Sequence, residues 1–268
     1  MANSCRSASA RSTAMLDLPA VLSTVLLAAS TLVLSTALVP QRSLARARGA
    51  QQQNAARDLS PDRFDMLVRS DMFAGMAGDR EALDRAMKLC EQVLAANQKD
   101  AAALVWHGSG LVFQAGQLFR AGDYVNGKQT IIRGFREMDD AVALAPESLE
   151  TLIPRGASLL GYSKHSNDPA RARPRLEQGL ADDEKVLAIQ KPSWNSVSVH
   201  ARGELLSGLV EGWVRAGDAA KARTYAQRIA DEMHGSRYAS RAQEFLAVPN
   251  PPAQIDWPCL GCHASAAR

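Results

Sequence analysis

The sequence has few aromatic residues and is not enriched in cysteine, glycine or proline. Of its 268 residues, 5% are aromatic, 18 are glycine, 12 are proline and 4 are cysteine. Glycine and proline are too few for a collagen repeat, and 46% hydrophobic with 22% charged residues excludes a coiled-coil rod and a disordered tail. After the N-terminal segment, no stretch alternates apolar and polar residues with the period of two that predicts a β-strand. One medium domain or one repeat array remains.

The body of the chain also lacks an excess of either charge. Lys and Arg number 31 against 28 Asp and Glu, a net charge of +3. Residues 1–47 alone account for this charge, with Arg6, Arg11, Arg42 and Arg46 against Asp17. Because nucleic-acid binding needs a basic surface, we expect no nucleic-acid partner for the neutral remainder.

A long uncharged run lies near the N-terminus. From Leu18 to Pro40, 23 residues carry no formal charge, which predicts a signal peptide or a membrane anchor within residues 1–47. The small residues of Ala45-Arg46-Ala47 favour cleavage. A helix of this length rises about 34 Å and spans about 30 Å of hydrocarbon, which favours retention. We expect an exported body, periplasmic or anchored to the cytoplasmic membrane, which touches the membrane only through this segment if it is uncleaved.

The rest of the chain is predicted to be helical. Residues 48–61 form a polar linker that ends at a helix start at Ser60-Pro61, and residues 62–246 place apolar residues at spacings of three and four. The tripeptide Ala-Gly-Asp occurs between such stripes at 77–79, 121–123 and 216–218. Glycine suits the left-handed residue that ends a helix and aspartate caps the next one, so each tripeptide predicts a tight joint.

Four equivalent positions near helix ends, Leu94, Val142, Leu187 and Ala230, follow one another at spacings of 48, 45 and 43 residues. This recurrence predicts four helical hairpins. Small residues such as Gly108 and Gly156 are expected where helix backbones approach closely.

The hairpins resemble the tetratricopeptide repeat family, whose 34-residue units pair two antiparallel helices. The last and second units carry the resemblance, through Leu209, Trp213, Gly217, Asp218 and Ala222 in the last and Ala141, Leu144 and Pro146 in the second. The resemblance implies an all-α solenoid of about four stacked hairpins, with a concave surface that binds a protein or peptide partner. The chain departs from the family in its wider spacing, in Pro154, which interrupts a predicted helix, and in a predicted inserted loop at residues 166–174.

The proline-rich tail, residues 247–268, is expected to lie outside the array and contains Cys259, Cys262 and His263 in a Cys-x-x-Cys-His pattern. This pattern is the attachment motif of c-type haem, in which two thiols bond to one porphyrin and the adjacent imidazole ligates its iron. A zinc site and a plain disulfide are the alternatives. Because c-type haem is attached outside the cytoplasmic membrane, the motif also favours export.

Only five residues follow the motif, too few for the rest of a cytochrome c domain. Three explanations stay open: the helical body covers the haem, the haem is exposed to a partner, or the gene product is truncated. If the body supplies a distal ligand, the candidates are His234 and Met233, which are close in sequence, and then His200, His107 and His165. The predicted role is not enzymatic: electron transfer, or docking to a redox partner. The alternative is a non-redox protein-binding module of the envelope.

Other conspicuous residues predict structure rather than chemistry. Cys90 lies on an apolar stripe and is expected in the core. His200 and Glu204 share a helix face and predict a surface pair rather than a metal site. The acidic runs 139–140 and 182–184 predict solvated helix faces.

Overall fold

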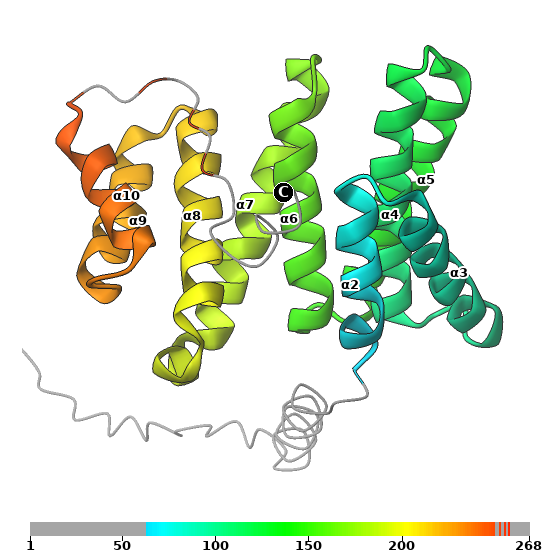
Figure 1. Cartoon of the computed structure of the whole chain (residues 1–268), viewed down its shortest axis with the longest axis horizontal. Coiled ribbons are helices and arrows are strands. Elements are labelled where there is room, and N and C mark those ends of the chain that lie inside the picture. The colour runs from blue at the N-terminus through cyan, green and yellow to red at the C-terminus, as the bar shows by residue number, and fades with distance from the viewer. Residues whose placement is uncertain (1–62, 250–251, 253–254, 256, 258–268) are drawn as a thin grey trace, which may run out of the picture. The chain divides into compact units, whose positions relative to one another are not determined.

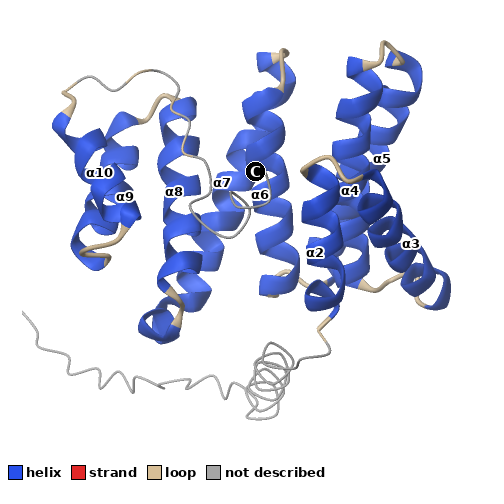
Figure 2. Ribbon diagram, in the orientation of Figure 1, coloured by secondary structure: helices blue, strands red, loops and turns tan. Residues whose placement is uncertain are grey.

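The computed structural model describes residues 63–249 and, in the tail, residues 252, 255 and 257. These residues belong to one compact unit and form nine α-helices and one short 3-10 helix, with no strand among them (Figure 2). The all-α prediction is confirmed at this level. The predicted leader, the linker and the helix start at Ser60-Pro61 lie outside the described residues. Within the described ranges, no helix is both long and apolar enough to cross a membrane.

The helices follow one another along the chain without long connections. Their bounds are α2 (Phe64–Met76), α3 (Arg80–Ala96), α4 (Ala101–Arg120), α5 (Tyr124–Leu144), α6 (Leu149–His165), α7 (Pro169–Gln190), the 3-10 helix η1 (Lys191–Ser196), α8 (Val199–Ala216), α9 (Ala219–Glu232) and α10 (Arg237–Ala247).

The three Ala-Gly-Asp joints form as the sequence predicts. Positive φ angles of 119°, 83° and 84° occur at Gly78, Gly122 and Gly217. The aspartate that follows each glycine caps α3, α5 or α9. Its carboxylate accepts a hydrogen bond from the backbone N–H three residues later, at 3.0, 3.1 and 2.9 Å. These caps satisfy N–H groups that the helix itself leaves without partners, so each joint is tight.

The helices pack most extensively in consecutive pairs, α2 with α3, α4 with α5, α6 with α7 and α8 with α9, and α10 packs on α9 (Figure 1). Glycines bring α4 and α5 together, because a Cβ on Gly108 would lie 2.6 Å from the backbone oxygen of Gly134. Two buried apolar clusters result. The N-terminal cluster draws on α2 to α6, and the C-terminal cluster draws on α7 to α10 with η1. Helix α6 contributes Leu159 to the first and places Leu160 against the second.

Two predicted interruptions are wrong. Helix α6 continues through Pro154, and α7 begins at Pro169, so the loop expected at residues 166–174 shrinks to 166–168. Asp168 caps α7, and Pro169 takes the first position, where a missing N–H costs no intrahelical hydrogen bond. Pro154 stands sixth in its helix, so the bond that it removes lies near the helix start. Long helices, with 20, 21 and 22 residues in α4, α5 and α7, therefore account for the wide spacing.

Candidate functional site

The tail returns to the helices at Trp257, the last described residue. Its backbone N–H donates a hydrogen bond to the carboxylate of Glu211 in α8. Its ring meets that of Phe245 in α10 edge to face, with centroids 5.7 Å apart, and the guanidinium carbon of Arg241 lies 5.6 Å from the ring centroid. Ile255 also packs against the C-terminal cluster. The tail is thus anchored on α8 and α10 at these residues.

Glu211 joins this anchor to α6. One carboxylate oxygen accepts the hydrogen bond from the tail, and the other lies 3.4 Å from Lys164 Nζ and 3.6 Å from Arg215 Nη2. Arg215 also donates to the carbonyl oxygen of Leu160 at 3.2 Å and to Ser163 Oγ at 2.9 Å. Burial lowers the pKa of Arg215, and the charge of Glu211 opposes that shift. The end of α6, the middle of α8 and the tail therefore share one polar cluster.

The motif residues Cys259, Cys262 and His263 lie outside the described residues. Both favoured distal candidates are described. Met233 is 2% exposed and belongs to the C-terminal cluster, whereas His234 is exposed in the turn between α9 and α10. These two residues stay sequence predictions for the distal position.

The other three histidines differ sharply in their surroundings. His107 is 2% exposed, with Nδ1 2.5 Å from Glu137 Oε2. Burial acts to raise the pKa of Glu137, but its contacts with His107 and Arg133 outweigh burial, so the pKa lies below its ordinary value. His200 Nδ1 lies 2.8 Å from the Tyr238 hydroxyl, in a half-exposed setting. His165 is exposed, ends α6 and directly follows Lys164.

A buried ionic cluster between α6 and α7 was missed at the level of sequence. Arg155 donates two hydrogen bonds of 2.7 Å to the two carboxylate oxygens of Asp182, and a third of 3.2 Å to Asp139. Asp182 is 4% exposed, so the prediction of a solvated acidic face at 182–184 is wrong for it. Burial raises the pKa of Asp182, and its hydrogen bonds from Arg155 oppose the rise.

The neighbouring Asp183 is also buried, at 6% exposure, and faces the backbone of α6. A Cβ on Gly156 would lie 2.5 Å from Asp183 Oδ1. Burial raises the pKa of Asp183 well above its ordinary value, and the charge of Asp182 adds to the rise. Sequence offered one usable signal, since the small Gly156 predicted a close helix approach, but nothing in the sequence identified a carboxyl group as the neighbour.

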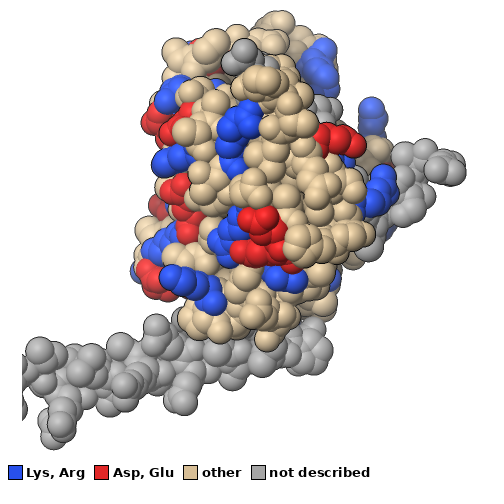
Figure 3. All heavy atoms as spheres, turned by 90° about the vertical axis from the view of Figure 1, so that its left-hand side faces the viewer, with Lys and Arg blue, Asp and Glu red and all other residues tan. Residues whose placement is uncertain are grey.

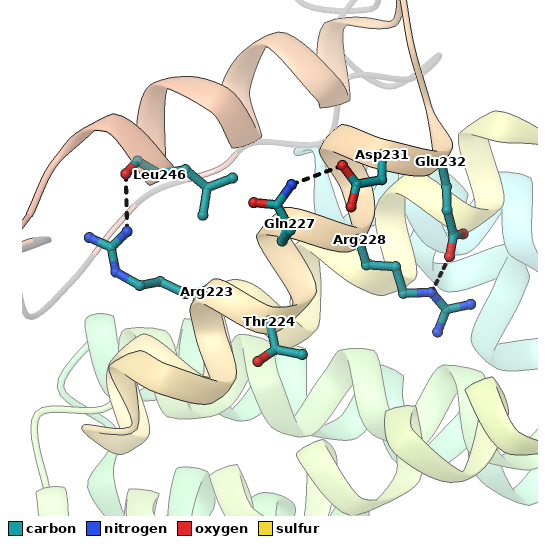
Figure 4. A pocket seen from close by; sticks show the side chains of 7 residues that line it. All are labelled: Arg223, Thr224, Gln227, Arg228, Asp231, Glu232 and Leu246. Atoms are coloured by element: carbon teal, nitrogen blue, oxygen red, sulfur yellow. Dashed lines mark hydrogen bonds and ion pairs between the residues drawn. The ribbon is translucent and has the colours of Figure 1, made fainter.

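The groove between α9 and α10 is shallow, with a volume of about 610 Å³ (Figure 4). Its polar side chains are paired with one another or with backbone. Arg228 Nε lies 2.5 Å from Glu232 Oε1, Gln227 donates to Asp231 at 2.8 Å, and Arg223 donates to the carbonyl of Leu246 at 3.0 Å. The face that these helices present carries basic and acidic side chains interspersed (Figure 3). We interpret this groove as a structural surface.

The prediction that Cys90 lies in the core is confirmed. Cys90 has no exposed surface, and burial raises the pKa of its thiol to about 12. His200 and Glu204 lie 4.0 Å apart with half-exposed side chains, as expected for a surface pair. Among the residues that the structure describes, no three His, Cys, Asp or Glu side chains are grouped to hold a metal ion. Comparison with family models, with curated proteins and with solved structures gave no match.

Proposed function

We propose that this chain is an exported helical-repeat protein that carries a covalent c-type haem at its C-terminus and serves electron transfer or docking to a redox partner. Cys259 and Cys262 would bond to the porphyrin, and His263 would ligate the iron. The observation that carries the proposal is the Cys-x-x-Cys-His spacing, which delivers two thiols and an imidazole to one group. When bound, the haem supplies one-electron chemistry, and the protein supplies orientation and surroundings.

The anchored tail supports a haem held against the helical body rather than on a loose end. Two residues of chain span at most about 7 Å, so the first thiol of the motif is tethered close to Trp257. Near that point lie the ammonium of Lys164 and the guanidinium of Arg215, whose charge suits the carboxylate groups of a porphyrin. Both side chains already pair with Glu211, so a porphyrin carboxylate would share them with that residue.

The helical body supports a role as a scaffold. Consecutive helix pairs and three identical joints are what a tetratricopeptide-like stack requires, in which each hairpin hides its apolar stripe against its neighbours. Such a stack would offer a protein or peptide partner an extended surface. The chain would then bring a redox group and a partner together without catalysing a reaction itself.

The test is covalent attachment. The full chain is produced in a host that matures c-type cytochromes, denatured, and examined for haem absorbance that stays with the polypeptide. We expect the haem to stay, and we expect the double variant Cys259→Ser/Cys262→Ser to lose it. Cys90→Ala is the matched control and should keep it, because this buried thiol lies outside the motif.

A colourless wild-type chain from that host would refute the redox role. Zinc analysis and the mass of the intact protein then separate the alternatives: bound zinc, or a loss of two hydrogens, would leave a non-redox binding module of the envelope with a structural cysteine pair.

A further inference from the structure

We infer that the carboxyl group of Asp183 is a proton-dependent latch, which holds α6, α7 and α8 together when it is protonated and loosens their contact when it is ionised. These three helices adjoin one another in the middle of the helical body (Figure 1). Helix α6 places Leu159 in the N-terminal cluster and Leu160 against the C-terminal cluster. The latch therefore lies where the two halves of the body meet, and it does not depend on a haem.

Asp183 extends from α7 into the contact between α6 and α8. A Cβ on Gly156 of α6 would lie 2.5 Å from Asp183 Oδ1, and a Cβ on Gly208 of α8 would lie 3.3 Å from Asp183 Oδ2. One carboxyl oxygen thus lies against each neighbouring helix, at a point where a glycine leaves room for it. The residue is only 6% exposed, so water has little access to the carboxyl group while the helices are packed.

No positive charge compensates this carboxyl group. Within the described part of the chain, its side chain makes no hydrogen bond and no ion pair. Arg155 of α6 donates its hydrogen bonds to Asp182 and Asp139 instead. The charge that acts on Asp183 is the negative one of Asp182, its neighbour on α7.

The other charged groups around this contact are paired elsewhere. On α8, Glu204 accepts a hydrogen bond from the Tyr238 hydroxyl, and Glu211 pairs with Arg215 of the same helix and with Lys164 of α6. On α7, Lys185 Nζ lies 2.6 Å from Glu147 Oε1. An ionised Asp183 would therefore have to be stabilised by water.

Loss of the proton and opening of the helix contact are coupled for this reason. Burial raises the pKa of Asp183 well above its ordinary value, and the charge of Asp182 adds to the rise, so the closed arrangement retains the proton. When the helices move apart, water reaches the carboxyl group and its pKa returns to about 3.9. Between these two pKa values, opening releases one proton, so its equilibrium constant should rise about tenfold per pH unit.

The test is backbone amide exchange of the full chain between pH 5 and pH 8, resolved by peptide with mass spectrometry. At each pH the wild type is compared with Asp183→Asn, which keeps the size of the side chain but does not ionise. The intrinsic exchange rate is the same in both chains, so their ratio reports the opening. We expect this ratio to rise with pH, by up to about tenfold per unit, in peptides of α6, α7 and α8.

Peptides of α3 and α10 are the internal reference, and their ratio should stay constant with pH. Asp140→Asn is the matched control: Asp140 is exposed on α5, so its variant should exchange like the wild type at every pH. Asp183→Ala is a second variant without an ionisable group and should give the same rise as Asp183→Asn. If neither variant folds, exchange in α6 to α8 of the wild type should still accelerate with pH relative to α3.

Three results would overturn the latch. The first is a ratio in α6 to α8 that does not change with pH. The second is an equal rise in α3 and α10, which would mean unfolding of the whole body rather than opening at this contact. The third is a pH-dependent acceleration that remains in Asp183→Asn, which would assign the proton to another group. The result of the haem test bears on none of these, so the two proposals stand or fall separately.

Discussion

Replacing Arg155 by methionine should destabilise the fold more than any surface ion-pair variant. The guanidinium makes two 2.7 Å hydrogen bonds to Asp182, and both residues are at least nine-tenths buried. Methionine keeps much of the volume but leaves the Asp182 carboxylate buried without its main partner. Breaking a buried ion pair in this way costs about 3–5 kcal/mol. At an m value of about 2 kcal/mol/M, the urea midpoint should fall by about 2 M.

The assay is urea unfolding followed by circular dichroism at neutral pH and at pH about 4, where carboxyl groups begin to protonate. The loss should shrink at the lower pH, because Asp182 can then be neutral. It should also shrink in the double variant Arg155→Met/Asp182→Asn, which removes the unpaired charge. Arg171→Met is the matched control: its 3.1 Å ion pair with Asp168 is exposed, and its removal should cost less than about 1 kcal/mol. Equal effects of the Arg155 and Arg171 variants would refute the reasoning.

Three further predictions follow from burial and backbone conformation. The pKa of Asp183 is raised in the folded state, so its contribution to stability is lost as pH rises above about 4. In urea unfolding, the free energy of unfolding of Asp183→Asn should therefore equal that of the wild type near pH 4 and exceed it near pH 8. A difference in free energy that does not change with pH would contradict this. Gly217→Ala should lower the free energy of unfolding by about 1–2 kcal/mol, because Gly217 has a φ of 84°. Gly161→Ala should raise it by about 1 kcal/mol, because Gly161 lies inside α6 with open space for a Cβ. Thermal and urea midpoints that shift in the same direction in both variants would contradict these two predictions. The Cys90 thiol, with its pKa raised to about 12, should resist iodoacetamide until the chain is unfolded, as peptide mapping by mass spectrometry would show; fast labelling of the native chain would contradict its burial.

The sequence predicts those features that neighbouring residues determine. The Ala-Gly-Asp joints are local: the glycine takes a positive φ and the aspartate caps a helix three residues ahead, so the tripeptide alone suffices. The burial of Asp182 could not be predicted in this way, because its partner Arg155 lies 27 residues away and on another helix. The same limit applies to the tail. Its proline-rich composition predicts a separate segment, but the contact of Trp257 depends on residues of α8 and α10.

The prediction of an inserted loop was wrong for a different reason. Residues 166–174 contain two prolines, and proline is common in loops, but it is also favoured at the first position of a helix after an aspartate cap. The pair Asp168-Pro169 is therefore a helix start. Weighing the position of each proline relative to a cap would have predicted α7.

The division of the apolar interior into an N-terminal and a C-terminal cluster has a consequence for how the molecule opens. Helices that contact chiefly their neighbours can melt from one end while the other end stays folded. Amide hydrogen exchange should therefore show one level of protection for the backbone amides N-terminal to α6 and another for those C-terminal to it. A mutation that unfolds α2 and α3 would then leave the contacts of Trp257 with α8 and α10 intact.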